Sequence, residues 1–167
     1  MDSTVVEADL GNPDHARGLL DVLDSYASGP AGGGRPLPPF VRDHLVSELA
    51  ARANALILLA IADRKPVGAA VCFLGFSTFA ARPLLNIHDL AVLPEFQGFG
   101  VGRTLLEAAE ARARQLDCCK LTLEVREDNE RAHSLYRSVG FGDFAAGAEP
   151  TPTRFLEKRL EAAGFDL

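Results

Sequence analysis

A turn with three alternating glycines lies between a predicted strand and a predicted helix in this 167-residue chain. Residues 97–103 (QGFGVGR) follow an apolar segment that Pro94 ends, and the apolar residues beyond them share one helical face: Leu105, Leu106, Ala109, Ala113 and Leu116. A helix N-terminus carries unpaired N–H groups and a partial positive charge, and glycine lets the main chain approach a phosphate without a Cβ atom in between. The sequence therefore predicts a strand, a glycine loop and a helix that together bind a diphosphate.

Three interpretations of this loop compete. A P-loop requires a lysine after its last glycine, and Arg103 follows Gly102 here, so that motif fails. A dinucleotide fingerprint requires G-x-G-x-x-G, but Arg103 holds the third glycine position, and the loop does not open the fold. The dinucleotide motif and a loop that only packs are retained as alternatives, although glycines at a helix start cost stability that something should offset.

Helix and loop patterns dominate the first third of the chain. Asn12, Pro13 and Asp14 form an N-cap, a first-turn proline and an acidic first turn, so we expect a helix that runs to about Tyr26. Residues 28–39 (SGPAGGGRPLPP) combine glycines and prolines that exclude regular structure, which predicts a long mobile loop. This loop is either a substrate gate or a plain disordered connection. A second helix is expected over residues 39–53.

Apolar or alternating patterns predict strands over residues 55–62, 67–75, 84–93, 120–125, 141–144 and 153–160. Residues 63–66 (DRKP) have the chemistry of a hairpin turn. Asn129 is expected to cap a last helix, and Gly140 stands where a left-handed C-terminal cap is needed. The predicted fold class is α/β (α+β): a single domain over residues 1–167 whose mixed sheet has helices on both faces.

Composition narrows the function classes. The chain is 47% apolar and 24% charged, which fits one packed core and excludes disordered, collagen-like and disulfide-rich chains. A net charge of −6 provides no basic field, so we expect no nucleic acid partner. The longest apolar run, 55–62, is too short to span a membrane, and the N-terminus carries acids where a signal peptide needs basic residues. We expect a cytoplasmic protein that does not contact a membrane.

Cysteine and histidine usage favours neither disulfides nor metal. Cys72, Cys118 and Cys119 are odd in number, and the adjacent pair sits at a predicted helix-to-strand junction, so we expect reduced, buried, structural thiols. The chain has no H-E-x-x-H motif and no paired C-x-x-C, so no metal site is expected.

An ordered set of residues in the second half resembles the GNAT superfamily of acyl-CoA-dependent N-acetyltransferases. The set consists of Leu90-Ala91-Val92, the Q-x-x-G-x-G signature in residues 97–103, Leu123-Glu124-Val125-Arg126, Asn129, Ala132, Leu135-Tyr136 and Gly140-Phe141. The resemblance covers about residues 86–144; the first eighty residues fit the element order but carry no diagnostic motif. It implies a mostly antiparallel central sheet.

The resemblance also implies acetyl-CoA as the acyl donor. The main chain of Leu90, Ala91 and Val92 would pair with the pantetheine arm as though it were another strand, beside a place where two strands splay apart. The resemblance further implies that Gln97, Gly98, Phe99, Gly100, Val101, Gly102 and Arg103 hold the pyrophosphate and that Asn129 contacts the cofactor.

Acetyl transfer requires a neutral amine, so a base is needed for an alkyl ammonium group, whose pKa is about 10.4. Glu124 is the first candidate because it breaks an apolar alternation in the predicted sheet; a solvent-facing or ion-paired Glu124 is the alternative. The His88-Asp89 pair could be a second candidate base, could supply a carboxylate that binds the acceptor, or could be a structural pair. The resemblance implies that Tyr136 protonates the leaving thiolate, although its place in the apolar stripe of a helix also fits a core tyrosine.

The function that these features predict is direct acetyl transfer from acetyl-CoA to an amine of a small molecule. One alternative acceptor is a protein N-terminus or lysine, which would need an open groove. A different class of function is a noncatalytic acyl-CoA-binding regulatory module. Similar proteins often form a homodimer, but no feature of this sequence determines one.

Overall fold

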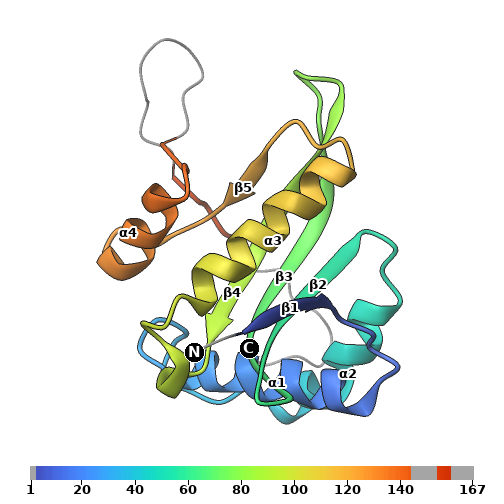
Figure 1. Ribbon diagram of the computed structural model, residues 1–167, viewed down its shortest axis with the longest axis vertical. Coiled ribbons are helices and arrows are strands. Elements are labelled where there is room, and N and C mark those ends of the chain that lie inside the picture. Colours follow the sequence, from blue (N-terminus) through green and yellow to red (C-terminus); the bar gives the residue numbers. More distant parts are fainter. Residues whose placement is uncertain (1–2, 144–153, 159–167) are drawn as a thin grey trace.

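The computed structural model describes residues 3–143 and 154–158. Its helices and strands, in chain order, are β1 (Thr4–Glu7), α1 (Pro13–Ser28), α2 (Pro39–Ala50), β2 (Ala55–Ala62), β3 (Lys65–Ser77), β4 (Arg82–Val92), α3 (Val101–Gln115), β5 (Leu121–Leu123) and α4 (Glu130–Ser138). A 3-10 turn at Pro94–Phe96 lies between β4 and α3. The described residues therefore form a mixed α/β fold, as the sequence predicted (Figure 1).

The sheet has the strand order β1-β2-β3-β4-β5. Every pairing is antiparallel except that of β4 with β5, which is parallel. At the β2–β3 hairpin, Asp63 and Arg64 both have positive φ, the conformation of a tight turn whose twist matches the flanking strands. The mostly antiparallel sheet expected from the resemblance is confirmed.

Helices cover both faces of the sheet (Figure 1). On one face, α3 buries Leu105, Leu106 and Ala109 against β2, β3 and β4. On the other face, α1 and α2 bury a separate cluster that includes Leu19, Val22 and Leu49. Two apolar layers thus fix the central strands from both sides, which leaves the ends of those strands as places for chemistry.

A β-bulge in β4 changes which side chains face which layer. Ile87 pairs with Cys72 and Asp89 with Val71, so His88 is an extra residue without a partner on β3. Before the bulge Ile87 packs in the α3 layer, whereas after it Leu90 packs there. A bulge shifts the strand's two-residue alternation by one, so Asp89 is turned toward the α1–α2 layer instead of the α3 layer.

β4 and β5 separate soon after they pair. Their last pair is Ile87 with Leu123, so among the described residues no strand lies beside the final residues of β4 on that side. Just before the separation, Asn86 Nδ2 donates to Thr122 Oγ1 at 3.1 Å, which ties the two strands together. The edge of β4 at Leu90–Val92 is therefore open, as the resemblance implied.

Several predicted boundaries were wrong. The sequence patterns missed β1, whose four residues are too few to show a period, and the strand expected over 120–125 is limited to Leu121–Leu123. The second helix ends at Ala50 instead of residue 53. The described parts of the two expected closing strands, 141–143 and 154–158, form no strand, and the remainder of both lies outside the described residues.

The three cysteines are free, as expected, but they differ in burial. Cys72 is buried in the core, Cys118 is half-buried and Cys119 is exposed, so the expectation of a buried thiol is wrong for Cys119. Burial, with Asp89 nearby, raises the pKa of the Cys72 thiol to about 12, which keeps it protonated and unreactive. Every helix that the structure describes is too short or too polar to span a membrane.

Candidate functional site

A cleft of about 660 Å³ lies where the open end of β4, the glycine loop, α4 and the end of α1 meet. We call it the glycine-loop cleft. Of the residues predicted from the sequence, it brings together Leu90, Ala91, Val92, Gln97, Gly98, Gly100, Val101, Gly102, Arg103, Asn129 and Tyr136. Phe99, which is 56% exposed, and Glu124 do not line it.

The glycines of the loop serve two purposes. Gly98 and Gly100 have φ of +88° and +87°, a left-handed conformation that L side chains rarely adopt, and a Cβ on either would point into open space. Gly102 is different because a Cβ there would lie 3.1 Å from Leu135 Cδ2. The first two glycines shape the loop toward the cleft, and the third lets α3 and α4 approach closely.

The main-chain amides of this loop have no protein partner within the described residues. The N-cap of α3 is Gly100, which offers no capping side chain, and the first amide of that helix to find an acceptor is that of Thr104, bonded to Gly100 O at 3.0 Å. The N–H groups of residues 98–103 are therefore available at the positive end of the helix dipole. This arrangement suits a phosphate or diphosphate.

Gln97 ties the loop to both neighbouring elements. Its Nε2 donates to Val92 O at 2.9 Å, at the open edge of β4, and its Oε1 accepts from Arg131 Nη1 at 2.7 Å. Arg103 reaches α4 in the same way, donating to Ser138 Oγ at 2.8 Å. Both arginines also line the cleft, and their positive charges add to the attraction of the loop amides for an anion.

Asn129 holds the start of α4. Its Oδ1 accepts the N–H of Ala132 at 3.1 Å, which confirms the predicted N-cap. The cap uses the oxygen of the side-chain amide, so its Nδ2 group is the part that can donate to a ligand in the cleft.

Tyr136 projects from α4 into the cleft. The left-handed Gly140, with φ of +96°, ends this helix as predicted, and Phe141 N donates to Tyr136 O at 3.0 Å. Burial raises the pKa of the Tyr136 hydroxyl above its usual range, and the nearby Tyr26 hydroxyl raises it further. The phenol therefore stays protonated at neutral pH, the state that a proton donor requires.

Tyr26 and the residues after it are parts of the cleft that the sequence patterns missed. Tyr26 lies in the last turn of α1, and Gly29, Pro30 and Ala31 follow it along the cleft wall. The helical period marked the buried side of α1 but did not indicate a site at its end. Within the expected mobile loop, the main-chain bond from Arg35 N to Ala27 O at 3.1 Å and the turn bonds of Gly32 and Gly34 to Gly29 O attach the chain to the end of α1.

A second cavity, the α1–α2 pocket, adjoins the cleft. It measures about 470 Å³ and lies between α1, α2 and the sheet, lined by Leu23, Tyr26, Ala27, Gly32, Leu37, Val41, Leu45, Glu48, Leu49, Arg52, Val71, Phe73, His88 and Asp89. Tyr26 lines both hollows, and Asp89 in the pocket directly precedes Leu90 in the cleft. The two hollows therefore meet along β4.

The two candidate bases differ in position. Glu124 is exposed, directly follows β5 and lines none of the three cavities described for the structure. Asp89 is half-buried in the α1–α2 pocket, where burial raises the pKa of its carboxyl and the adjacent His88 opposes the rise. The structure thus brings the His88-Asp89 pair, and not Glu124, beside the cleft.

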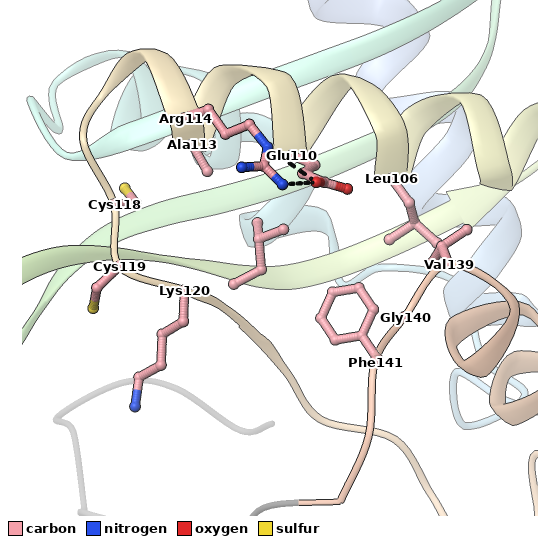
Figure 2. A pocket seen from close by; sticks show the side chains of 11 residues that line it. Leu106, Glu110, Ala113, Arg114, Cys118, Cys119, Lys120, Val139, Gly140 and Phe141 are labelled. Atoms are coloured by element: carbon pink, nitrogen blue, oxygen red, sulfur yellow. Dashed lines mark hydrogen bonds and ion pairs between the residues drawn. The ribbon is translucent and has the colours of Figure 1, made fainter.

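A third cavity of about 280 Å³ lies beside the C-terminal half of α3 (Figure 2). Phe141 and the ion pair between Glu110 and Arg114 line it, while Cys119 and Lys120 point away from α3. It contains none of the residues predicted for the site. Among the described residues, no group of three His, Cys, Asp or Glu side chains could hold a metal ion.

Comparison with known proteins also indicates an acetyltransferase. The model of the acetyltransferase (GNAT) family matches residues 23–141. Over 102 residues, covering 59% of this chain and 67% of the relative, the sequence is 32% identical to aminoglycoside N(6')-acetyltransferase type 1 of Stenotrophomonas maltophilia. Over 76 residues, 44% of this chain and 46% of the relative, it is 41% identical to N-alpha-acetyltransferase RimI of Mycobacterium tuberculosis.

Among solved structures, the chain is similar to an aminoglycoside acetyltransferase from an uncultured soil metagenomic sample in complex with trehalose. The TM-score is 0.72, with 94% of this chain and 97% of that chain covered, at 17% identity. This likeness supports the fold. The matched regions span two thirds of the first curated relative and less than half of the second, and the names of these relatives point to different acceptors.

Proposed function

The chain belongs to the acetyltransferase (GNAT) family, and from this we propose that it transfers the acetyl group of acetyl-CoA directly to an amine of a small molecule. The observation that carries the proposal is the set of main-chain amides at residues 98–103 that have no acceptor in the described part of the chain, beside the open edge of β4 and in one cleft with Tyr136. The amides and the neighbouring arginines suit the pyrophosphate, and the open edge of β4 suits an extended amide-containing arm such as pantetheine.

The acetyl thioester supplies an activated acyl carbon, and the residues of this chain supply position and protons. The main-chain amides at the end of β4 are suited to polarise the thioester oxygen. Tyr136, kept protonated by burial, donates its proton to the departing thiolate. The amine nitrogen forms the new C–N bond as the C–S bond breaks, so no covalent enzyme intermediate is needed.

The walls of the α1–α2 pocket favour a small-molecule acceptor over a protein. The segment after α1 contributes Gly32 and Leu37 to the α1–α2 pocket and is anchored to α1 by main-chain hydrogen bonds. A folded protein substrate would need an open groove at this place. The aminoglycoside acetyltransferase relative also acts, by its name, on a small molecule.

Glu124 is the base expected from the sequence, and its exposed place after β5 means that it would have to act through water. Replacing Glu124 by glutamine tests that role: an unchanged dependence of kcat/KM on pH would remove Glu124 from the mechanism.

Isothermal titration with acetyl-CoA, CoA and NAD tests the proposal as a whole. We expect binding of acetyl-CoA and CoA and no binding of NAD, followed by release of free CoA thiol when an amine panel is added. Binding of NAD without CoA would support the dinucleotide alternative, and binding of CoA without thiol release would favour a noncatalytic binding module.

A further inference from the structure

The α1–α2 pocket is largely hydrocarbon. Its apolar lining includes Val41 and Leu45 from α2, Leu23 from α1, and Val71 and Phe73 from β3. A pocket of this size and composition suits a small molecule with an apolar body.

Two carboxylates near this pocket are already paired. Asp24 accepts the N–H of Leu37 at 2.8 Å and forms an ion pair with Arg42 at 2.9 Å. Glu48 forms an ion pair with Arg52 at 2.8 Å. Neither carboxylate is therefore well suited to bind a second cationic group of a ligand.

Asp89 differs from these two. Among the described residues it forms no salt bridge with Lys or Arg, and its ionisable neighbours are His88 and Cys72. His88 is itself packed edge-on against Phe73, with ring centroids 5.5 Å apart. Among the described residues, the pocket thus presents one half-buried carboxylate that no Lys or Arg pairs with, set among apolar side chains.

The position of Asp89 connects the pocket to the proposed chemistry. The bulge at His88 turns Asp89 toward α1 and α2, while the next residue, Leu90, lines the glycine-loop cleft. An amino group held by Asp89 would lie beside the open edge of β4, where the thioester is proposed to lie.

We propose that the α1–α2 pocket is the acceptor site and that it takes a primary amine with an apolar, uncharged body, bound through its amino group to Asp89. This inference rests on the proposed function. The ammonium group loses two protons overall: one passes to Asp89 and on to solvent, and the other replaces the proton that Tyr136 gives to the thiolate. A polycationic, polyhydroxylated aminosugar should be a poor acceptor. Its hydroxyl groups would be buried against apolar side chains, and only the Asp89 carboxylate could pair with its several ammonium groups.

An acceptor panel tests this preference on the full chain with saturating acetyl-CoA. We expect 2-phenylethylamine and hexylamine to exceed kanamycin, spermidine and a lysine-containing peptide by at least about tenfold in kcat/KM. If acetyl-CoA binds and kanamycin or the peptide is the better acceptor, this inference is wrong while the proposed function stands. If acetyl-CoA does not bind, the proposed function is wrong, and the acceptor inference that rests on it falls as well.

Two valines on α2 provide a matched pair of variants. Val41 lines the pocket and Val46 does not, and both are half-buried. Val41→Lys should lower kcat/KM for 2-phenylethylamine by about tenfold or more, and Val46→Lys by less than about twofold, with unchanged acetyl-CoA affinity in both. Equal effects of the two variants would contradict the assignment of the pocket.

Asp89→Asn tests the amino-group anchor. It should lower kcat/KM for apolar amines by about 100-fold or more and leave the acetyl-CoA dissociation constant within about twofold. A variant that folds, binds acetyl-CoA and retains wild-type turnover would overturn the role of Asp89.

Discussion

The glycine-loop cleft and the α1–α2 pocket meet along β4, yet they are built from different parts of the chain. In the cleft, the groups proposed to bind the donor are largely main-chain groups between Leu90 and Arg103, a nearly continuous stretch with a recognisable motif. The pocket depends on side chains from α1, α2, β3 and β4, none of them in a motif. A backbone conformation that a local motif encodes can bind the donor, whereas a particular acceptor must be selected by side chains. The two halves of one reaction therefore differ in how visible they are in a sequence.

The largest effect should come from changing the backbone of the cleft. Gly100→Val places a β-branched residue at a φ of +87° and a side chain where the phosphate would lie. We expect acetyl-CoA affinity to fall by roughly 100-fold, about 2.8 kcal/mol, in isothermal titration. Gly33→Val is the matched control, because Gly33 also has a left-handed φ, of +108°, and lines neither hollow. Similar losses of affinity in both variants would mean that strain alone is responsible.

Tyr136→Phe should separate binding from chemistry within the cleft. It removes the proposed proton donor but keeps the aromatic ring, whose centroid lies 6.0 Å from that of the Phe141 ring. We expect kcat to fall by about 100-fold and acetyl-CoA affinity to change little, measured by thiol release and by titration. A loss of thermal stability with no specific loss of kcat would instead indicate a core tyrosine.

Gly32→Ala should act mainly on the pocket. A Cβ at this position would lie 2.1 Å from Tyr26 O and 2.6 Å from Ala27 Cα, so the segment would have to move off the end of α1. We expect the KM for the acceptor to rise about 5- to 10-fold, with a smaller change in the KM for acetyl-CoA. Gly142→Ala, where a Cβ meets nothing within 4 Å, is the control. A larger rise in the KM for acetyl-CoA than in the KM for the acceptor would show that Gly32 serves the glycine-loop cleft and not the α1–α2 pocket.

The Asp89→Asn variant should also alter stability in a pH-dependent way. Burial raises the pKa of Asp89 in the folded chain, so ionising this carboxyl destabilises the fold as the pH rises through its folded value. The asparagine variant should therefore have a higher melting temperature than the wild type at pH 7, and the difference should disappear toward and below the ordinary carboxyl pKa of about 3.9. A lower melting temperature at pH 7 would show that the Asp89 carboxylate stabilises the fold.

The smallest effect is expected at the third cavity. Cys119 is exposed and points away from α3 (Figure 2). Its main-chain N–H donates to Pro83 O at 2.8 Å. Cys119→Ser should change kcat/KM by less than about twofold in the same assay. A tenfold loss of kcat/KM would indicate that the acceptor binds on this side of α3 and not in the α1–α2 pocket.

Local patterns were sufficient for the elements that carry the cofactor motif. The cap at Asn129, the helix after the glycine loop and the left-handed Gly140 follow from short-range hydrogen bonding and backbone preference, so they could be predicted. β1 could not, because its four residues form a strand only through pairing with β2. The expected role of Glu124 depended on a continuous strand over 120–125, and the strand ends at Leu123.

Local patterns were enough to predict the family, the mixed sheet with helices on both faces, and a glycine loop at the start of a helix, because glycine spacing and helix periodicity are local properties. Only the folded chain shows that a bulge at His88 turns Asp89 toward α2, that β4 and β5 separate after Ile87, and that Tyr26 and Tyr136 line one cleft. These features depend on the register and packing of segments up to 110 residues apart, information that no short stretch of the chain contains.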